Sequence, residues 1–214
     1  MKILLLIISF GVMTHINAQK TYSIYYSQVT EIADFTLQGQ KLTHKIEARL
    51  IFNDSISFFY FIAPNKKDKF KEKKIIGDKL VHHGLVYNRN NDELLSEVAW
   101  PKKNYYLLKT EQPVFDWTFT KETKSLLGYK CNQAIWPNST GDTLFAWYTN
   151  EINNIFGPMF YFGLPGVVLE VYGHKKNSLL TVKSIDVVPI TLVQPDKNIP
   201  ILNMEAHLRK TMKD

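Results

Sequence analysis

The side chains that most often carry out chemistry in proteins are few and scattered in this sequence. His82 and His83 are adjacent, and neighbouring side chains of a strand point to opposite faces, so this pair is poorly placed to share a metal ion. His44, His174 and His207 each stand alone. A structural metal needs clustered ligands. We therefore predict no metal site and no cofactor.

Three acids, Asp116, Glu151 and Glu170, lie in or near the most unusual stretch of the chain. Only Glu170 stands in an apolar strand pattern, where burial would raise its pKa, but we expect it to point to solvent. The local patterns of serine hydrolases, zinc peptidases, dithiol enzymes and nucleotide-binding loops are absent. We predict no catalytic residues. The alternative is a hydrolase that pairs Glu170 or Asp116 with a histidine.

Cys131 is the only cysteine, so no disulfide can form within the chain. Its neighbours include Tyr129, Ile135 and Trp136. A free cysteine among such residues usually behaves as a small buried hydrophobe. We predict a buried thiol that does not react in the native state.

Basic residues give the chain a net charge of +6 and gather in one segment. Six lysines fall between Lys66 and Lys74. A block of like charges is typical of an exposed loop, and we predict that it serves solubility. The alternative is contact with anionic lipid at a membrane surface. Nucleic acid is not an expected partner.

Most of the chain has the residue pattern of β-strands, so strands are expected to position these residues. Many short strands joined by short turns predict antiparallel sheet, because parallel strands need long crossovers. Helical periodicity is limited to one turn at 150–156 and an amphipathic helix at 199–212. We predict a mainly β (β-rich α+β) fold: a large, curved antiparallel sheet, of half-barrel form, with minor helix. The expected strands are 21–26, 42–52, 57–62, 79–87, 93–100, 105–109, 115–120, 129–136, 143–148, 167–172 and 179–188.

A stretch rich in glycine, proline and aromatic residues runs from Gly157 to Glu170. Pro165 followed by Gly166 suits the central positions of a type II turn, with positive φ at the glycine. Aromatic residues near such turns can line a groove for a lipid or peptide. The alternative is that they fill the core. The candidate groove residues are Trp147, Tyr148, Gly157, Pro158, Phe162, Gly163, Leu164, Pro165 and Gly166.

The segment Gly163-Leu164-Pro165-Gly166-Val167-Val168 resembles the signature of the GLPGLI family of exported bacterial proteins, with Val-Val in place of Leu-Ile. The sequence Gly128-Tyr129-Lys130-Cys131 resembles the family's Gly-Tyr-x-Cys element, and Trp147-Tyr148-Thr149 with Ile152 resembles a second element. The resemblance covers about a quarter of the chain. It implies an envelope protein of Gram-negative bacteria, and it implies no catalytic residues.

The first 18 residues have the zones of a secretory signal peptide in the expected order. Lys2 precedes an apolar run from Ile3 to Val12, and Ala18 ends a more polar cleavage region. The run is too short for the ~20 residues that cross a bilayer. We expect residues 1–18 to be a signal peptide, residues 19–214 to form a single β-rich domain without a transmembrane segment, and the protein to reside in the periplasm, with outer-membrane association or secretion as alternatives.

These observations favour a non-catalytic binding or accessory protein of the cell envelope. Its expected partner is an apolar small molecule, a peptide or an envelope protein. The alternative is a periplasmic hydrolase with an acid–histidine pair.

Cleavage after Ala18 is the first testable expectation. The protein recovered from the envelope should begin at Gln19 or within two residues of it, because Ala18 suits the position before the cleaved bond. N-terminal sequencing and intact mass measure the start directly. Recovery of the full-length chain from the membrane fraction would contradict it.

Overall fold

A computed structural model of the chain describes residues 19–33, 41–62, 75–76, 84–90, 92–99, 105–137, 141–174 and 178–211. The expected leader, the lysine-rich segment and His82–His83 lie outside these residues.

Strands make up nearly all of the regular structure. The strands are β1 (Thr21–Ala33), β2 (Lys41–Phe52), β3 (Ile56–Ile62), β4 (Ile75–Ile76), β5 (Leu85–Asn88), β6 (Glu93–Ala99), β7 (Tyr105–Thr110), β8 (Thr118–Leu126), β9 (Tyr129–Pro137), β10 (Thr143–Thr149), β11 (Val167–Gly173), β12 (Ser178–Val188), β13 (Thr191–Leu192) and β14 (Ile201–Leu202). The described helix is α1 (Met204–Thr211).

Twelve strands form one sheet in the order β14-β7-β6-β5-β3-β2-β1-β12-β11-β10-β9-β8. Sequential neighbours pair antiparallel, which short turns such as the one at Asn53 permit. Two pairs are parallel, β14 with β7 and β13 with β4, and each spans two residues per strand. The prediction of a mainly β fold built on a large curved sheet is confirmed. The large sheet is mixed through the β14–β7 pair, whereas β13 and β4 form a separate two-stranded sheet.

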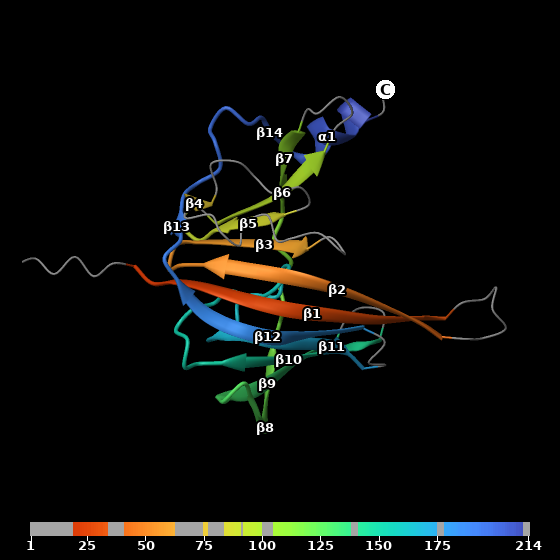
Figure 1. Cartoon of the computed structure of the whole chain (residues 1–214). Coiled ribbons are helices and arrows are strands. Elements are labelled where there is room, and N and C mark those ends of the chain that lie inside the picture. Colours follow the sequence, from red (N-terminus) through yellow and green to blue (C-terminus); the bar gives the residue numbers. More distant parts are fainter. Residues whose placement is uncertain are drawn as a thin grey trace, which may run out of the picture.

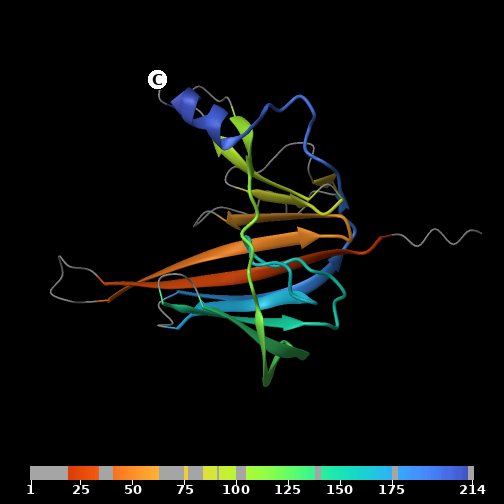
Figure 2. The same ribbon diagram turned by 180° about the vertical axis from the view of Figure 1, so that it is seen from behind.

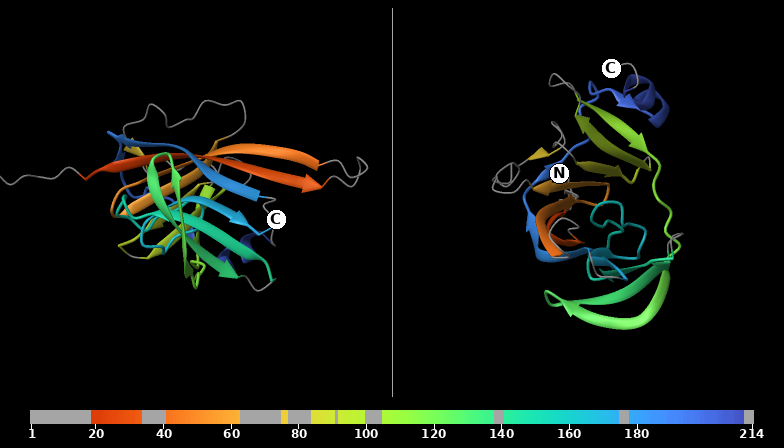
Figure 3. Two further views of the ribbon diagram at one scale, coloured as in Figure 1. Left: turned by 90° about the horizontal axis from the view of Figure 1, so that it is seen from below. Right: turned by 90° about the vertical axis from the view of Figure 1, so that its right-hand side faces the viewer.

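The sheet curves strongly but does not close. Its two ends, β8 and the β7–β14 pair, lie at opposite ends of the molecule in Figure 1. Figure 3, in its right-hand view, shows the strands bending around an interior that holds the chain between β10 and β11. The chain between β7 and β8 runs across the open side, as Figure 2 shows from behind. We call residues 150–166 the motif loop and residues 111–117 the bridging segment.

The main core forms where the motif loop meets the central strands. Leu50 and Phe52 of β2 are fully buried, and so is Phe156 of the motif loop. The Phe156 ring meets those of Phe52 and Tyr87 edge-on, each with centroids 5.7 Å apart. Fully burying one such side chain contributes about 1.5–3 kcal/mol. The loop therefore acts as the cover that the inner face of the sheet requires.

The C-terminal helix is shorter than expected. Ile201 and Leu202 pair with β7 instead of joining the helix, and Asn203 caps it by accepting the Ala206 N–H at 2.8 Å. The Tyr106 hydroxyl lies 2.5 Å from His207 Nδ1 and holds α1 against β7. The expected helical turn at 150–156 is wrong, because residues 153–157 have no regular structure and the Ile155 N–H is bound by the side chain of Asn154. Within the described part of the chain, no helix has the length and hydrophobicity that crossing a bilayer requires.

Cys131 is buried in the main core, as predicted. Burial raises the pKa of its thiol to about 11, since the thiolate would lose its hydration. Its Sγ lies 3.6 Å from the carbonyl oxygen of Tyr129.

The native thiol should therefore alkylate slowly. A pKa two units higher leaves about 100-fold less thiolate near pH 8, and burial blocks the reagent further. Maleimide labelling followed by mass spectrometry should be fast in guanidinium and at least about 100-fold slower in the native protein. Equal rates in the two states would contradict the buried position.

Candidate functional site

The motif loop is tied to three separate parts of the fold. Asn154 Nδ2 donates to the carbonyl oxygen of Asn53 at 3.0 Å, which fixes the loop to the β2–β3 turn. The Trp117 indole N–H donates to the carbonyl oxygen of Phe162 at 3.4 Å, which fixes it to the bridging segment. Glu151 accepts the Lys130 N–H at 2.7 Å, which fixes it to β9. The loop is thus held at two points near its start and at one point near its end.

Two glycines allow the motif loop to pack closely. A Cβ at Gly166 would lie 2.2 Å from the carbonyl oxygen of Thr149, and one at Gly157 would lie 1.9 Å from that of Tyr161. Within the motif loop, positive φ occurs at Met159 (56°) and Gly163 (86°) and not at Gly166. The predicted type II turn with positive φ at Gly166 is therefore wrong. Gly166 is needed because β10 passes against it, a long-range contact that a local turn pattern does not contain.

Most of the sequence-predicted groove residues lie in the interior. Trp147 and Tyr148 are 7% and 5% exposed, and Leu164 is fully buried. Gly157, Pro158 and Gly166 are also buried, whereas Pro165 is exposed at the surface. Phe162 and Gly163 alone among the nine border a cavity found in the described structure. The aromatic residues of the motif thus mostly pack in the core, the alternative that the sequence had left open.

That cavity is an open cleft of about 1070 Å³ between the motif loop and the bridging segment. Its walls come from four places in the sequence that the fold brings together. They are Tyr87 and Asp92 around the β5–β6 turn, residues 109–115 at the end of β7 and in the bridging segment, Ile155, Phe162 and Gly163 of the motif loop, and residues 203–205 at the start of α1.

Aromatic rings form the apolar side of the cleft. The rings of Tyr87 and Phe162 stack with centroids 4.9 Å apart and planes 7° apart. Phe115 stacks on Trp117 at 5.1 Å and meets Trp136 edge-on at 5.0 Å. Because each lining ring is packed against another, the apolar surface is rigid.

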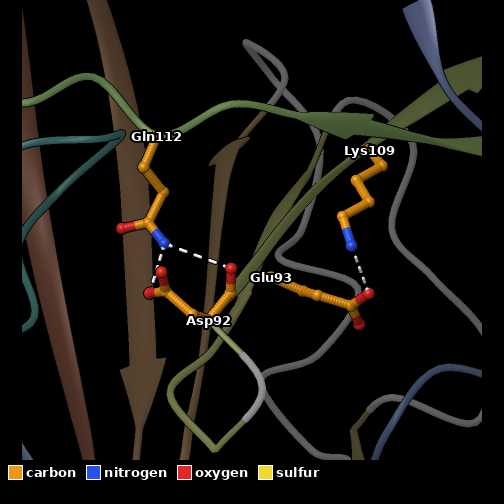
Figure 4. A network of polar contacts seen from close by, with 4 residues as sticks. All are labelled: Asp92, Glu93, Lys109 and Gln112. Carbon is orange, nitrogen blue, oxygen red and sulfur yellow. Dashed lines mark hydrogen bonds and ion pairs between the residues drawn. The ribbon is translucent and has the colours of Figure 1, made fainter.

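A polar network fixes one rim of the cleft, as Figure 4 shows. Asp92 Oδ1 accepts hydrogen bonds from Gln112 Nε2 at 2.6 Å and from the Tyr87 hydroxyl at 2.9 Å. These donors, Gln112 first, hold the pKa of the Asp92 carboxyl below its usual range. Beside it, Lys109 Nζ binds Glu93 Oε1 at 2.8 Å. Asp92 thus stays ionised at neutral pH and points its charge at the cleft rim.

Asp92, the charged residue at the rim of the cleft, has an unusual backbone conformation. Its φ is +55°, in the left-handed region that few residues other than glycine, asparagine and aspartate adopt. Such conformations gather at functional sites when the surrounding contacts enforce them. The side chain of Asp92 is held in place by Gln112 and Tyr87.

Glu170, the acid favoured by the sequence, lies in the interior and away from the cleft. The prediction that it points to solvent is wrong, because it is 9% exposed. A register shift between Trp147 and Tyr148 leaves Leu169 without a partner on β10 and breaks the simple alternation of β11. Glu170 is bound by the Lys124 ammonium and by the Thr181 hydroxyl at 3.0 Å.

The other acids and the histidines are not brought together with Glu170. Asp116 is exposed, and Glu151 binds the backbone of Lys130. His207 contacts Tyr106, and His174 packs against the ring of Phe145. Among the residues that the structure describes, no cluster of three His, Cys, Asp or Glu side chains could hold a metal ion.

Sequence reasoning missed most of the cleft. The missed residues include Tyr87, Asp92, Gln112, Val114 and Phe115. Asp92 falls between the predicted strands 79–87 and 93–100, and the end of the bridging segment was assigned to the predicted strand 115–120. The available signal was weak: an Asp at the end of a turn cluster, and an apolar Val114–Phe115 pair after Pro113.

Comparison with known proteins bears on the fold and on the motif. A family model described as a protein of unknown function (Porph_ging) matches residues 137–170, which include the whole Gly157–Glu170 stretch and the last residue of β9. No curated protein sequence matches the chain. The family match thus coincides with the motif loop and its flanking strands.

Among solved structures, the chain is similar to PNGF-II in a P21 crystal form, with a TM-score of 0.66 and 20% identity over 92% of this chain and 34% of that one. The C2 crystal form of PNGF-II gives a TM-score of 0.63 and 20% identity over 90% and 32%. An uncharacterized conserved protein from Thermus thermophilus gives a TM-score of 0.45 and 9% identity over 86% and 91%. The chain therefore spans about a third of the length of PNGF-II, with which it shares a fold.

Adding one methyl group at Gly166 should destabilise the protein. In Gly166→Ala the new Cβ meets the backbone of Thr149, which cannot move as a flexible side chain can. Overpacking of this kind costs about 3 kcal/mol, which lowers the melting temperature by roughly 6–12 °C for a chain of this size. Thermal unfolding followed by circular dichroism measures it.

The matched control is Pro165→Ala at the exposed neighbouring position. Its melting temperature should change by no more than about 2 °C, a shift expected from a surface substitution. Equal melting temperatures for Gly166→Ala and the wild-type protein would show that the close contact with β10 is not needed.

Proposed function

We propose that this is an exported, non-catalytic binding or accessory protein that takes a partly apolar ligand in the cleft beside the motif loop. The observation that carries the proposal is the composition of the cleft: a stacked Tyr87–Phe162 pair on one side and an ordered Asp92–Gln112 pair on the rim. Binding sites typically combine an apolar lining with a few fixed polar groups.

The apolar part of the cleft supports a ligand with a hydrophobic body. Val114 is 89% exposed and Met204 is 47% exposed, and both line the cleft. Exposed apolar side chains that converge on one cavity often mark a site of interaction. A volume of about 1070 Å³ lies slightly above the range of roughly 300–1,000 Å³ that is typical of small-molecule sites.

The rigidity of the walls supports binding without a large rearrangement. Phe162 is held by its stack on Tyr87 and by the Trp117 bond to its carbonyl oxygen. Asp92 is held by two donors. A site whose groups are ordered before binding loses less conformational entropy when the ligand arrives.

The partners of the acids favour a binding role over the hydrolase alternative. Glu170 binds a lysine and a threonine, and Asp92 binds an amide and a phenol. General acid–base catalysis requires a carboxylate and its partner within hydrogen-bond reach of a bound substrate. Asp92, which lines the cleft, has neutral donors in that place.

The proposed compartment is the periplasm of a Gram-negative bacterium. Its support is the signal-peptide pattern of residues 1–18 and the resemblance of the motif to the GLPGLI family. The stability of the fold without disulfides is compatible with this compartment, because the apolar core is extensive.

Occupation of the cleft can be tested with Nile red, an uncharged apolar dye. The wild-type protein should bind it with a rise in fluorescence and a shift to shorter wavelength. Val114→Arg should weaken binding at least about fivefold, because it places a charge at the apolar rim. The dye titration measures both.

The control is Val187→Arg, at a position on β12 that is 61% exposed and lies outside the cleft lining. Binding by this variant should equal that of the wild-type protein. Unchanged dye binding by Val114→Arg, or no binding by the wild-type protein, would refute a ligand site in this cleft.

A further inference from the structure

We infer that the ligand of the cleft is an extended peptide segment of a partner protein that presents a basic side chain to Asp92. The inference rests on the proposed function, since it names the class of ligand for the same cleft. Three features of the cleft carry it: an unpaired extended backbone, an acidic rim on a basic protein, and apolar walls between them.

The bridging segment offers backbone groups to a ligand. Residues 111–117 belong to no helix or strand, and no backbone–backbone hydrogen bond joins them to another residue in the described part of the chain. Five of these residues line the cleft. Apart from Pro113, each carries an N–H as well as a C=O group. An extended peptide laid beside such a segment forms strand-like hydrogen bonds with it, a common mode of peptide recognition.

The rim of the cleft is acidic although the whole chain carries a net charge of +6. The charged residues that line the cleft are Asp92, Glu111, Glu205 and Lys109. Lys109 is neutralised by Glu93, and Glu205 is paired with Arg209. Asp92 and Glu111 line the cleft as carboxylates with no ion pair to a basic residue in the described part of the chain.

Asp92 is set up to receive a cation. Both of its side-chain donors, Gln112 and Tyr87, contact Oδ1, which leaves Oδ2 open to a ligand. Both donors are uncharged, so the full negative charge of the carboxylate is retained. A lysine or arginine side chain supplies the charge-assisted hydrogen bond that this oxygen accepts.

The apolar walls match the remaining side chains of such a segment. Phe115 and Phe162 line the cleft, and Val114 projects from the bridging segment itself. Side chains of an extended peptide alternate between two directions, so apolar residues next to the basic one reach these walls while the backbone pairs with the bridging segment. A small apolar molecule would leave both the backbone groups of the bridging segment and Asp92 Oδ2 without a partner on the ligand.

The test is selection from a displayed library of random hexapeptides on the immobilised full chain. Wild-type protein should enrich sequences with lysine or arginine at one fixed position and apolar residues beside it. The matched variant is Asp92→Asn, which keeps the shape and tolerates the positive φ but removes the charge. It should bind the selected peptides at least 10-fold more weakly, and it should lose the preference for a basic residue.

Two synthetic versions of the best peptide separate the contributions. Norleucine in place of the basic residue should bind wild-type protein and Asp92→Asn equally weakly. N-methylation of alternate backbone amides should weaken binding to both proteins, since it removes donors to the bridging segment. Glu122→Gln, an exposed acid on β8 outside the cleft, should bind the selected peptides as tightly as wild-type protein does.

Three outcomes would overturn the peptide inference. The selected peptides lack a basic residue, the wild-type protein enriches peptides no more strongly than Val114→Arg does, or the wild-type protein and Asp92→Asn bind the selected peptides equally tightly. If Nile red still binds the wild-type protein and not Val114→Arg in that case, the cleft binds a different class of ligand and the proposed function stands. If the wild-type protein binds neither the peptides nor Nile red, both proposals fail.

Discussion

The packing of the motif loop into the curved sheet is the contact on which the rest of this structure depends. An open sheet has an apolar inner face that must be covered, and here one loop of the same chain covers it. Phe156 is fully buried between Phe52 and Tyr87, and Gly157 and Gly166 let the loop approach its neighbours where a Cβ would clash. The glycine and proline content of the motif is thus explained by close packing, before any ligand is considered.

The same packing creates the cleft. Phe162 stacks on Tyr87, and Tyr87 in turn donates its hydroxyl hydrogen bond to Asp92, so a loop after β10 and a turn before β6 share one chain of contacts. The bridging segment completes the opposite wall because it must cross the open side of the sheet to connect β7 with β8. The cleft therefore lies between the motif loop, which covers the core, and the bridging segment, which crosses the open side of the sheet.

The buried acid of the molecule has a structural task that differs from that of the acid at the cleft. Glu170 on β11 binds Lys124 on the edge strand β8, and the Lys124 ammonium lies 4.3 Å from the centre of the Trp147 ring. This contact spans β9 and β10 and ties the edge strand to the sheet. A buried pair of this kind adds little net stability compared with apolar packing, but loss of one partner leaves an uncompensated charge. Asp92, with neutral donors and an exposed position, keeps its charge available.

The sequence alone determined the β-rich fold and the approximate positions of most of the longer strands, because strands follow from local composition and alternation. The two-residue strands β4, β13 and β14 were not predicted. It also identified the stretch around Gly157–Gly166 as special and Cys131 as buried. Only the tertiary structure decided why Gly166 must be glycine, that Glu170 is buried, and that Gln112 reaches Asp92 across 20 residues. The need for glycine at position 166 depends on the neighbouring strand β10, and the burial of Glu170 depends on a register shift. The contact between Gln112 and Asp92 depends on the path of the bridging segment. None of the three is encoded by the pattern of adjacent residues, since each arises from the way distant parts of the chain pack together.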